Sequence, residues 1–466
     1  MATLPQTVGD LRRSEYGVAS VKAELRRNLI RKLTSGEPLF PGIRGYDDTV
    51  LPQLENAILA GQDIVLLGER GQAKSRLVRA LVSLLDEHIP AIAGCEINDD
   101  PYAPICRRCR DLVADHGDET AISWLGRERR YSEKLATPDT SIADLIGEVD
   151  PIRVAEGRYL SDELTIHFGL VPRTNRGIFA INELPDLAER IQVGLLNVIE
   201  ERDVQIRGYR IRLPLDVYVV ATANPEDYTN RGRIITPLKD RFGAQIRTHY
   251  PRTLEHEIAI VEQEHTVFED SPAEVRVPAY LKEIIAEITH LARRSPQVNQ
   301  RSGVSVRVSI ANYENLSANA LRRAIRKGEK EAVPRISDLP SLVASSSGKL
   351  ELETWEEGDD TAVLEKIIRT ATSNVFRRHF TVQEFADVVQ RFDRSGFTVE
   401  VSDGAAADTY LPVVRDLGGL ERVLGKLDEP STPASQAAAL EFVLEGLHLS
   451  KGLNKTPVDG SAIYGG

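Results

Sequence analysis

The sequence lacks several features, and each absence excludes a class of protein. It holds only 3 cysteines among 466 residues, which is too few for a disulfide framework. No apolar run approaches the ~20 residues that span a bilayer, and residues 1–13 lack the apolar segment of a secretory signal. We therefore expect a cytoplasmic protein without a membrane span.

Positive charge is also in the minority, with 58 basic against 70 acidic residues and a formal net charge of −12. Because proteins that bind nucleic acid generally present a basic surface, we expect no specific nucleic-acid partner. The hydrophobic content of 41 % is sufficient to build buried cores. A chain of this length exceeds what one core normally serves, so we expect two or three domains.

Short apolar runs alternate with helical patterns between residues 38 and 250, which predicts an α/β fold with a parallel sheet flanked by helices. Residues 63–67, 177–181 and 217–221 are almost continuously apolar, as expected of strands covered on both faces. The flanking regions are helix-prone. The domains expected are an N-terminal helical extension (1–37), a nucleotide-binding core (38–250), a helical lid domain (251–380) and a helical C-terminal region (381–466).

Residues near the two ends of the 381–466 region carry further local signals. Thr381 followed by Glu384 is a capping-box pattern, which predicts the start of a helix. Leu440, Val443, Leu444 and Leu447 recur at helical spacing and predict a last amphipathic helix. The final residues, 460–466, are rich in glycine and small side chains, so we expect a flexible tail.

A phosphate-binding loop is predicted directly after the first strand, from Gly68, Gly71, Ala73, Lys74, Ser75 and Arg76. Glycines let backbone amides turn toward phosphates, Lys74 would reach the β- and γ-phosphates of ATP, and the Ser75 hydroxyl would ligate Mg²⁺. Ala73 departs from the general pattern, which has a glycine there. The alternative is an ordinary strand-to-helix turn.

The strand over 177–181 ends in Asn182 and Glu183, where many P-loop enzymes have two carboxylates. Glu183 fits the role of the base that activates water. Asn182 can bind a metal-bound water but contributes no negative charge, which would weaken Mg²⁺ binding or turnover. Alternatively, both residues merely end a strand.

Two further polar residues follow in chain order. Asn224 comes at the end of the strand over 217–221, where its amide would contact the γ-phosphate or the attacking water. Arg241 lies about sixteen residues beyond Pro225 and would reach a neighbouring subunit's nucleotide as an arginine finger. A lone arginine more often forms a surface ion pair, which is the alternative.

The order of these motifs resembles AAA+ ATPases of the magnesium-chelatase motor-subunit and MoxR groups over residues 38–330. The Gly-x-x-Gly-x-Ala-Lys-Ser loop is similar to the MoxR form, and residues 147–176 and 201–216 resemble hairpin inserts of the same clade. The resemblance implies an AAA+ core with Asn224 as the first sensor. It also implies Arg307 as the second sensor arginine, with Arg301 and Arg322 as competitors, and Tyr46 beside the adenine.

What the resemblance implies for function is a homo-oligomer, a hexameric ring, in which ATP hydrolysis remodels a partner with a von Willebrand A-type domain. Two roles compete: a magnesium-chelatase motor that serves insertion of Mg²⁺ into protoporphyrin, and a MoxR-like chaperone. A nucleotide-binding scaffold with little hydrolysis is a further alternative. An enhancer-dependent transcription activator shares the fold, but neither its characteristic loop nor a DNA-binding unit is present in the sequence.

The three cysteines cluster with a histidine after the phosphate-binding loop. Cys95, Cys106, Cys109 and His116 offer three thiolates and one imidazole, a ligand set suited to tetrahedral Zn²⁺. We expect such a site to order an insertion over residues 94–130. Three ordinary reduced thiols are the alternative.

Overall fold

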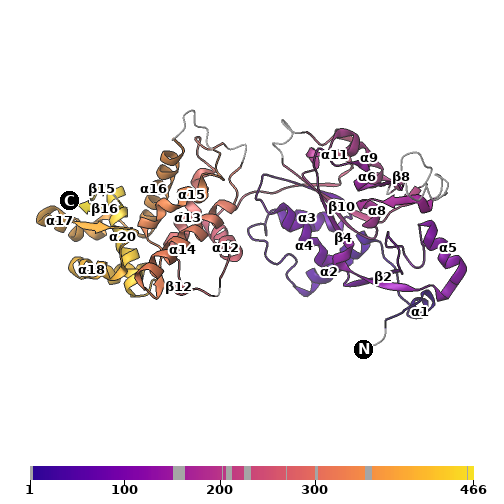
Figure 1. Ribbon diagram of the computed structural model, residues 1–466, viewed down its shortest axis with the longest axis horizontal. Coiled ribbons are helices and arrows are strands. Elements are labelled where there is room, and N and C mark those ends of the chain that lie inside the picture. Colours follow the sequence, from indigo (N-terminus) through magenta and orange to yellow (C-terminus); the bar gives the residue numbers. More distant parts are fainter. Residues whose placement is uncertain are drawn as a thin grey trace. The chain divides into compact units, whose positions relative to one another are not determined.

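The computed structural model describes residues 4–150, 163–201, 203–205, 212–224, 232–268, 270–299, 303–351, 359–458 and 460–466. These residues form two compact units, Met1–His249 and Tyr250–Gly466. Figure 1 labels their helices and strands. Within the described ranges, no helix is both long and apolar enough to cross a membrane.

A five-stranded sheet lies at the centre of the N-terminal unit, in the order β11 (Ala244–Arg247), β1 (Ile64–Leu67), β10 (Val217–Ala223), β7 (Gly177–Asn182) and β4 (Tyr131–Leu135). All four pairings are parallel. The α/β fold with a parallel sheet flanked by helices is confirmed, and β1, β7 and β10 correspond to the three apolar runs predicted as strands.

Alternate residues of the central strands enter two different cores. Val65, Phe179 and Val219 belong to one core, whereas their neighbours Leu66 and Ala180 belong to the other. Because successive side chains of a strand point to opposite faces, both faces of this sheet are buried. This is the physical reason for the continuous apolar runs in the sequence.

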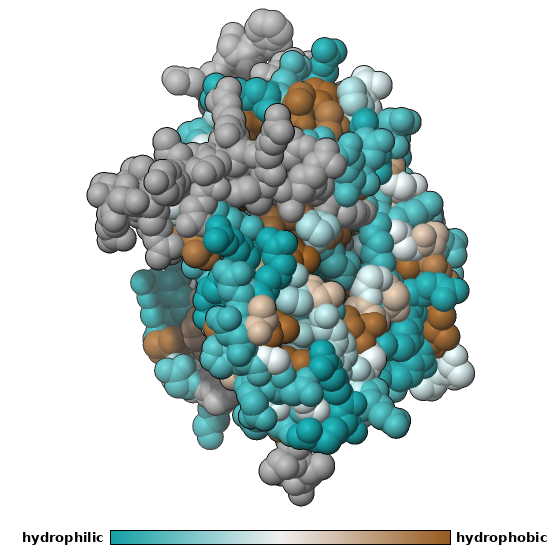
Figure 2. All heavy atoms as spheres, turned by 90° about the vertical axis from the view of Figure 1, so that its right-hand side faces the viewer, coloured by the Kyte–Doolittle hydropathy of each residue, from teal (hydrophilic) through white to brown (hydrophobic). Residues whose placement is uncertain are grey.

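Helices supply both covering layers (Figure 1). One layer contains α2 (Val21–Ser35), α3 (Val50–Leu59) and α4 (Lys74–Ala80). The other contains α6 (Ile142–Leu145), α8 (Leu170–Arg173), α9 (Glu189–Glu200) and α11 (Thr236–Arg241). The face of this unit in Figure 2 is mostly hydrophilic, with hydrophobic side chains in small separate groups.

The residues expected as an N-terminal extension contribute α1 (Val8–Arg13) and α2 to the same compact unit. On α2, Glu24 accepts two hydrogen bonds from the Arg130 guanidinium, at 2.7 and 2.6 Å, and both side chains are almost fully buried. Arg130 also donates to the Arg176 carbonyl, just before β7. A buried, two-pronged ion pair therefore connects α2 to the segments that lead into β4 and β7.

The insertion over residues 94–130 is built on an antiparallel pair of strands, β2 (His88–Ile92) and β3 (Ile122–Gly126). The chain between them contains α5 (Arg107–His116). A small separate core forms where Leu11 of α1 packs against Ile122 of β3. The insertion is thus a hairpin with a helix in its connection.

Two more antiparallel pairs occur where hairpin inserts were expected. They are β5 (Gly147–Val149) with β6 (Ile166–Phe168), and β8 (Asp203–Gln205) with β9 (Arg212–Pro214). Residues 151–162 and 206–211 of these two inserts lie outside the described residues.

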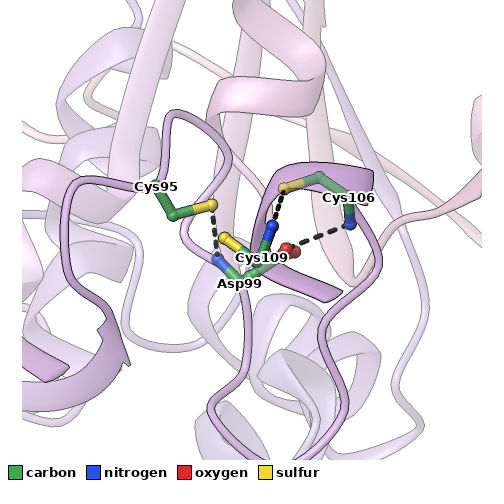
Figure 3. Close-up of side chains that lie close together, drawn as sticks. All are labelled: Cys95, Asp99, Cys106 and Cys109. Carbon is green, nitrogen blue, oxygen red and sulfur yellow. Dashed lines mark hydrogen bonds between the residues drawn. The ribbon is translucent and has the colours of Figure 1, made fainter. Parts of the chain in front are cut away.

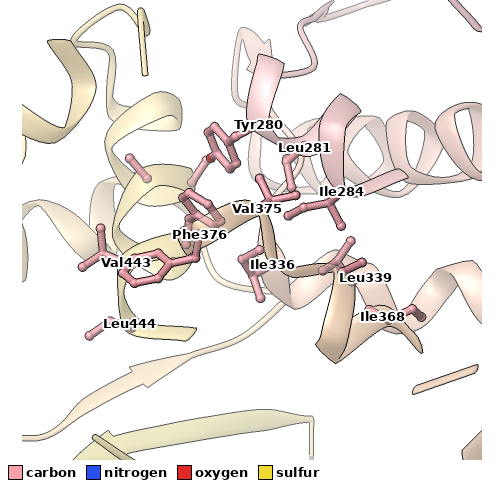
Figure 4. Close-up of a cluster of buried hydrophobic side chains, with 14 of the residues drawn as sticks. Tyr280, Leu281, Ile284, Ile336, Leu339, Ile368, Val375, Phe376, Val443 and Leu444 are labelled. Atoms are coloured by element: carbon pink, nitrogen blue, oxygen red, sulfur yellow. The ribbon is translucent and has the colours of Figure 1, made fainter. Parts of the chain in front are cut away.

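The C-terminal unit is mainly helical, and one core of apolar side chains runs through it. Its helices are α12 (Leu254–Glu264), α13 (Ala279–Ala292), α14 (Arg307–Lys327), α15 (Leu342–Ser346), α16 (Asp359–His379), α17 (Ala386–Ser395), α18 (Leu411–Leu417), α19 (Leu420–Lys426) and α20 (Pro433–Leu449). Figure 4 shows side chains of this core, in which the rings of Phe376 of α16 and Tyr280 of α13 both pack against Phe442 of α20. The expected lid and C-terminal regions therefore share one core.

Two expectations about the C-terminal region were wrong. The helix predicted as amphipathic is α20, and residues on all its sides are buried, because it lies inside the core. The tail predicted as flexible forms β16 (Ser461–Gly465), which pairs with β14 (Val399–Val401) and β15 (Asn454–Val458). A short parallel pair, β12 (Glu274–Val275) and β13 (Glu331–Ala332), also belongs to this unit. The capping box from Thr381 to Glu384 is confirmed.

Candidate functional site

The predicted phosphate-binding loop connects β1 to α4. Gly68 donates its backbone N–H to the Ala223 carbonyl at 3.1 Å, which joins the start of the loop to the end of β10. Gly71 and Ala73 have φ of +74° and +54°. A left-handed conformation costs a residue with a Cβ roughly 1 kcal/mol, so the backbone itself explains the usual preference for glycine at the position of Ala73.

Lys74 and Ser75 open α4. The Lys74 ammonium is almost buried and donates to the carbonyls of Gly68 and Glu69, the latter at 2.9 Å, so it lies in the curve of its own loop. Ser75 is exposed on the first turn of the helix, and Arg76 follows it. The loop therefore encloses a cation beside the N-terminal end of a helix, which is the arrangement that binds phosphate.

Buried polar side chains hold the loop in shape from behind. The Tyr46 hydroxyl lies 2.8 Å from the carbonyl oxygens of both Gln72 and His249, where it can donate its one proton to either, and Thr248 donates to Gln72 Oε1 at 2.7 Å. A Cβ at Gly68 would overlap the side-chain oxygens of Thr248 and Gln72. Burial raises the pKa of Tyr46 to about 12. Tyr46 thus packs against the loop as a neutral donor, and its predicted place beside adenine stays a prediction.

Asn182 and Glu183 lie where β7 ends. Glu183 takes a left-handed conformation, with φ of +55°, and its backbone N–H donates to Thr222 Oγ1 at 3.1 Å. The same hydroxyl donates to Asn182 Oδ1 at 3.3 Å. Thr222 of β10 therefore fixes both residues, which turn out of the strand at the edge of the sheet.

Glu133 is a residue of this corner that sequence reasoning missed. It lies on β4, accepts a hydrogen bond from Asn182 Nδ2 and forms an ion pair with Arg79 of α4 at 2.9 Å. Burial raises its pKa, but hydrogen bonds from Arg79 and Tyr131 outweigh burial and leave the pKa of Glu133 below its ordinary value. A carboxylate therefore stands beside the amide of Asn182. Only the pairing of β4 with β7 reveals it.

The register of the sheet brings the predicted motifs to one edge. Leu67 pairs with Ala223, and Ala221 pairs with Ile181, so the loop that starts at Gly68 lies next to Asn224 and one strand away from Glu183. Asn224 is buried at this edge. In parallel α/β sheets, ligands bind beyond the carboxyl ends of the strands. The residues expected to contact ATP and Mg²⁺ thus converge there.

The predicted arginines belong to the helices α11 and α14. Arg241 ends α11, where it forms an ion pair with Glu200 of α9 and donates to the Pro237 carbonyl at 2.8 Å. Within one chain it is therefore an ion-pair partner, and its role in a neighbouring subunit stays a prediction. Arg307 begins α14 of the C-terminal unit, and its competitor Arg322 lies near the end of the same helix. Arg301 lies outside the described residues.

A second cluster lies in the insertion. Cys95, Asp99, Cys106 and Cys109 direct ligand atoms toward one another, and these atoms all lie within 4.8 Å (Figure 3). His116 does not belong to this group: it is exposed at the end of α5, and its ring nitrogen lies 3.1 Å from the Leu112 carbonyl. The prediction of His116 as the fourth ligand was wrong, because the loop after Cys95 turns Asp99 into that position instead.

The chain is similar in sequence to several known proteins. A model of the Sigma-54 interaction domain matches residues 155–241. The magnesium-chelatase 38 kDa subunit of Rhodobacter capsulatus is 29 % identical over 51 % of this chain and 63 % of its own length. The magnesium-chelatase subunit ChlI of Nephroselmis olivacea is 28 % identical over 61 % of this chain and 78 % of its own. The chain is thus similar to magnesium-chelatase subunits over 51–61 % of its length.

The chain spans 63 % of the length of the Rhodobacter subunit, so activity, substrate and partners do not transfer with the likeness. Among solved structures, a model of the complex between subunits BchI and BchD of magnesium chelatase is 22 % identical. It covers 71 % of this chain and 98 % of the other, with a TM-score of 0.36. A likeness that distant supports no functional conclusion.

The residues at the sheet edge fit the ATP and Mg²⁺ that such relatives imply. The loop offers an enclosed ammonium and a serine hydroxyl on the first helical turn. Glu133 and Glu183 supply carboxylates nearby. Lys74 and the loop amides would hold the phosphates, and Ser75 would hold Mg²⁺.

Proposed function

We propose that the protein is a ring-forming AAA+ ATPase that couples ATP hydrolysis to the remodelling of a protein partner. The observation that carries the proposal is the convergence of the phosphate loop, Asn224 and Glu183 at the carboxyl edge of three adjacent strands. Each of these groups is common alone. Their meeting at one edge, around a buried lysine, supports a P-loop hydrolase.

The proposed roles follow from chemistry. Bound Mg²⁺ would neutralise charge on the phosphates. Lys74 binds the terminal phosphates, Asn224 positions the attacking water by hydrogen bonding, and Glu183 accepts its proton. Glu133, next to Asn182, places a negative charge near the position where related enzymes carry it on the strand end itself.

Steady-state ATP hydrolysis tests the catalytic part. Glu183→Gln should lower kcat about 100-fold or more while ATP affinity stays within about 3-fold, because only the base is lost. Glu201→Gln, at an exposed position just after α9, is the matched control and should retain full activity. If the unaltered protein hydrolyses ATP no faster than Glu183→Gln, the ATPase proposal fails and the nucleotide-binding scaffold, which Asn182 favours, replaces it.

Arg241 is the proposed contribution of each subunit to its neighbour's site. Arg241→Ala and Glu183→Gln should each be inactive alone, yet mixing them should recover part of the activity. In a mixed ring, some interfaces pair the intact Glu183 of an Arg241→Ala subunit with the intact Arg241 of a Glu183→Gln neighbour. Glu200→Gln, which removes only the ion-pair partner of Arg241, is the control and should remain active. No recovery on mixing would exclude the arginine finger.

The ring size and the partner complete the proposal. We propose a hexamer in the cytoplasm and a partner with a von Willebrand A-type domain, as the resemblance to the magnesium-chelatase and MoxR groups implies. The chelatase role and the chaperone role are both compatible with the site. Light scattering with and without ATP tests the hexamer. Mg²⁺ insertion into protoporphyrin, assayed with candidate partner subunits, separates the two roles.

A further inference from the structure

The cysteine cluster forms no part of the proposed nucleotide site. Its four residues come from two short segments of the connection between β2 and β3: Cys95 and Asp99 from a turn, Cys106 and Cys109 from the start of α5. Three of the four are buried and Cys95 is partly so. The chain has no other cysteine.

The spacing of the ligand atoms fits one metal ion. Zinc–sulfur bonds of about 2.3 Å in a tetrahedron place the ligand atoms about 3.8 Å apart. The four ligand atoms of this cluster all lie within 4.8 Å of one another, so a small contraction would complete the shell. An iron–sulfur cluster holds several metal and sulfide atoms between its ligands and needs a wider group.

Backbone donors around the ligands are arranged as in a metal site. Asp99 and Cys109 donate their N–H groups to Cys95 Sγ and Cys106 Sγ, each at 3.4 Å, and Cys106 donates its own to Asp99 Oδ2 at 3.0 Å (Figure 3). Such bonds stabilise thiolates and fix the orientation of ligands. The ligand set is thus preorganised.

Without a cation, the cluster carries an electrostatic cost. Asp99 Oδ1 is buried and accepts no N–H or O–H bond from the described part of the chain. Buried carboxylates are normally paired. A divalent ion would replace the thiol protons and satisfy the Asp99 oxygen together.

The sparse packing of α5 also supports a bound ion at this cluster. Of its ten residues, only Cys109 is buried. The turn before it is better held, since Asn175 donates to the Ile97 carbonyl at 3.0 Å and Asn98 donates to the Arg173 carbonyl at 2.9 Å, just ahead of β7. A metal bound by both segments would fasten α5 to that turn.

We infer that Cys95, Asp99, Cys106 and Cys109 bind one Zn²⁺ in a tetrahedral structural site. Thiolate ligands and four-coordinate geometry favour zinc over the hard cations Mg²⁺ and Ca²⁺, which prefer six or more oxygen ligands. The ion orders the insertion and joins it to the segment that enters β7. This site is independent of ATP binding.

Metal analysis of the full chain, purified without chelator, tests the inference. One equivalent of zinc per chain is expected. The zinc should be released only when a mercurial reagent modifies the three thiols. Asp99→Ala and Cys109→Ser should lose the zinc, whereas His116→Ala and Asp115→Asn, both at exposed positions of α5, should keep it.

A spectroscopic measurement on the unaltered sequence covers the case in which the ligand variants fail to fold. Cobalt exchanged for the metal should show the intense visible bands of a tetrahedral site and sulfur-to-cobalt charge transfer. Less than about half an equivalent of zinc, a Cys106–Cys109 disulfide, stoichiometric iron or octahedral cobalt spectra would each overturn the inference. Loss of zinc from His116→Ala would overturn the ligand assignment.

Discussion

The contact between Asn182 and Glu133 makes a prediction that separates this site from the common two-carboxylate arrangement. Asn182 donates to Glu133 Oε1, and Arg79 holds that carboxylate ionised. In the pair of Glu133 and Asn182 only Glu133 carries a charge, and the amide of Asn182 is a required hydrogen-bond donor to it. Asn182→Asp, which restores the common residue, should consequently destabilise the protein.

The size of the loss follows from the contact. Two carboxylates about 4 Å apart at an effective dielectric constant near 20 repel by about 4 kcal/mol. Loss of a hydrogen bond to a charged acceptor adds about 1.5–3 kcal/mol. Arg79 and water screen the repulsion, because the Glu133 side chain keeps 20 % of its exposure. We expect a net loss of about 2–4 kcal/mol without Mg²⁺, and a smaller loss with it, because a divalent ion binds between carboxylates.

Urea unfolding measures this loss. The chain has two tryptophans, so a Trp355→Phe background leaves Trp124 of β3 as the fluorescent reporter of the N-terminal unit. Adding Glu133→Gln to Asn182→Asp should recover stability to within about 1 kcal/mol, because one charge and one amide are again paired. The reasoning is refuted if Asn182→Asp alone is as stable as the parent without Mg²⁺, or if the second substitution recovers nothing.

Two further predictions concern the C-terminal unit. A Cβ at Gly446 of α20 would overlap the buried Phe376 ring, so Gly446→Ala should lower the stability of this unit by about 1–3 kcal/mol in hydrogen-exchange measurements. Gly425→Ala on α19, where a Cβ has open space, should instead stabilise by up to about 1 kcal/mol. Hydrogen bonds from Lys426 and from the Thr381 cap lower the pKa of Glu384 to about 2. The stabilisation that ionised Glu384 gives to the folded state should therefore vanish as pH falls from about 4.5 toward 2. Glu384→Gln should make the melting temperature less dependent on pH across that window. If the slope of melting temperature against pH is unchanged in this variant, Glu384 is not the source of the pH dependence.

The sequence alone predicted the sheet and the main residues at its edge. Continuous apolar runs identify strands buried on both faces, and Lys74, Glu183 and Asn224 each follow such a run. Since parallel strands present their carboxyl ends at one edge, chain order was enough to bring these residues together. The capping box at Thr381 was equally local, because its hydrogen bonds span only three residues.

Only the tertiary structure decided contacts between segments that are distant in sequence. Glu133 precedes Asn182 by 49 residues, and nothing in the sequence around it distinguishes it from a solvent-exposed acid on a strand. Asp99 displaced His116 because a tight turn, held by Asn175 and Asn98, points the carboxylate at the thiols. The burial of α20 on all sides likewise depends on neighbours from α13 and α16. Local patterns determine which elements form, whereas the partner of each side chain depends on how the chain packs.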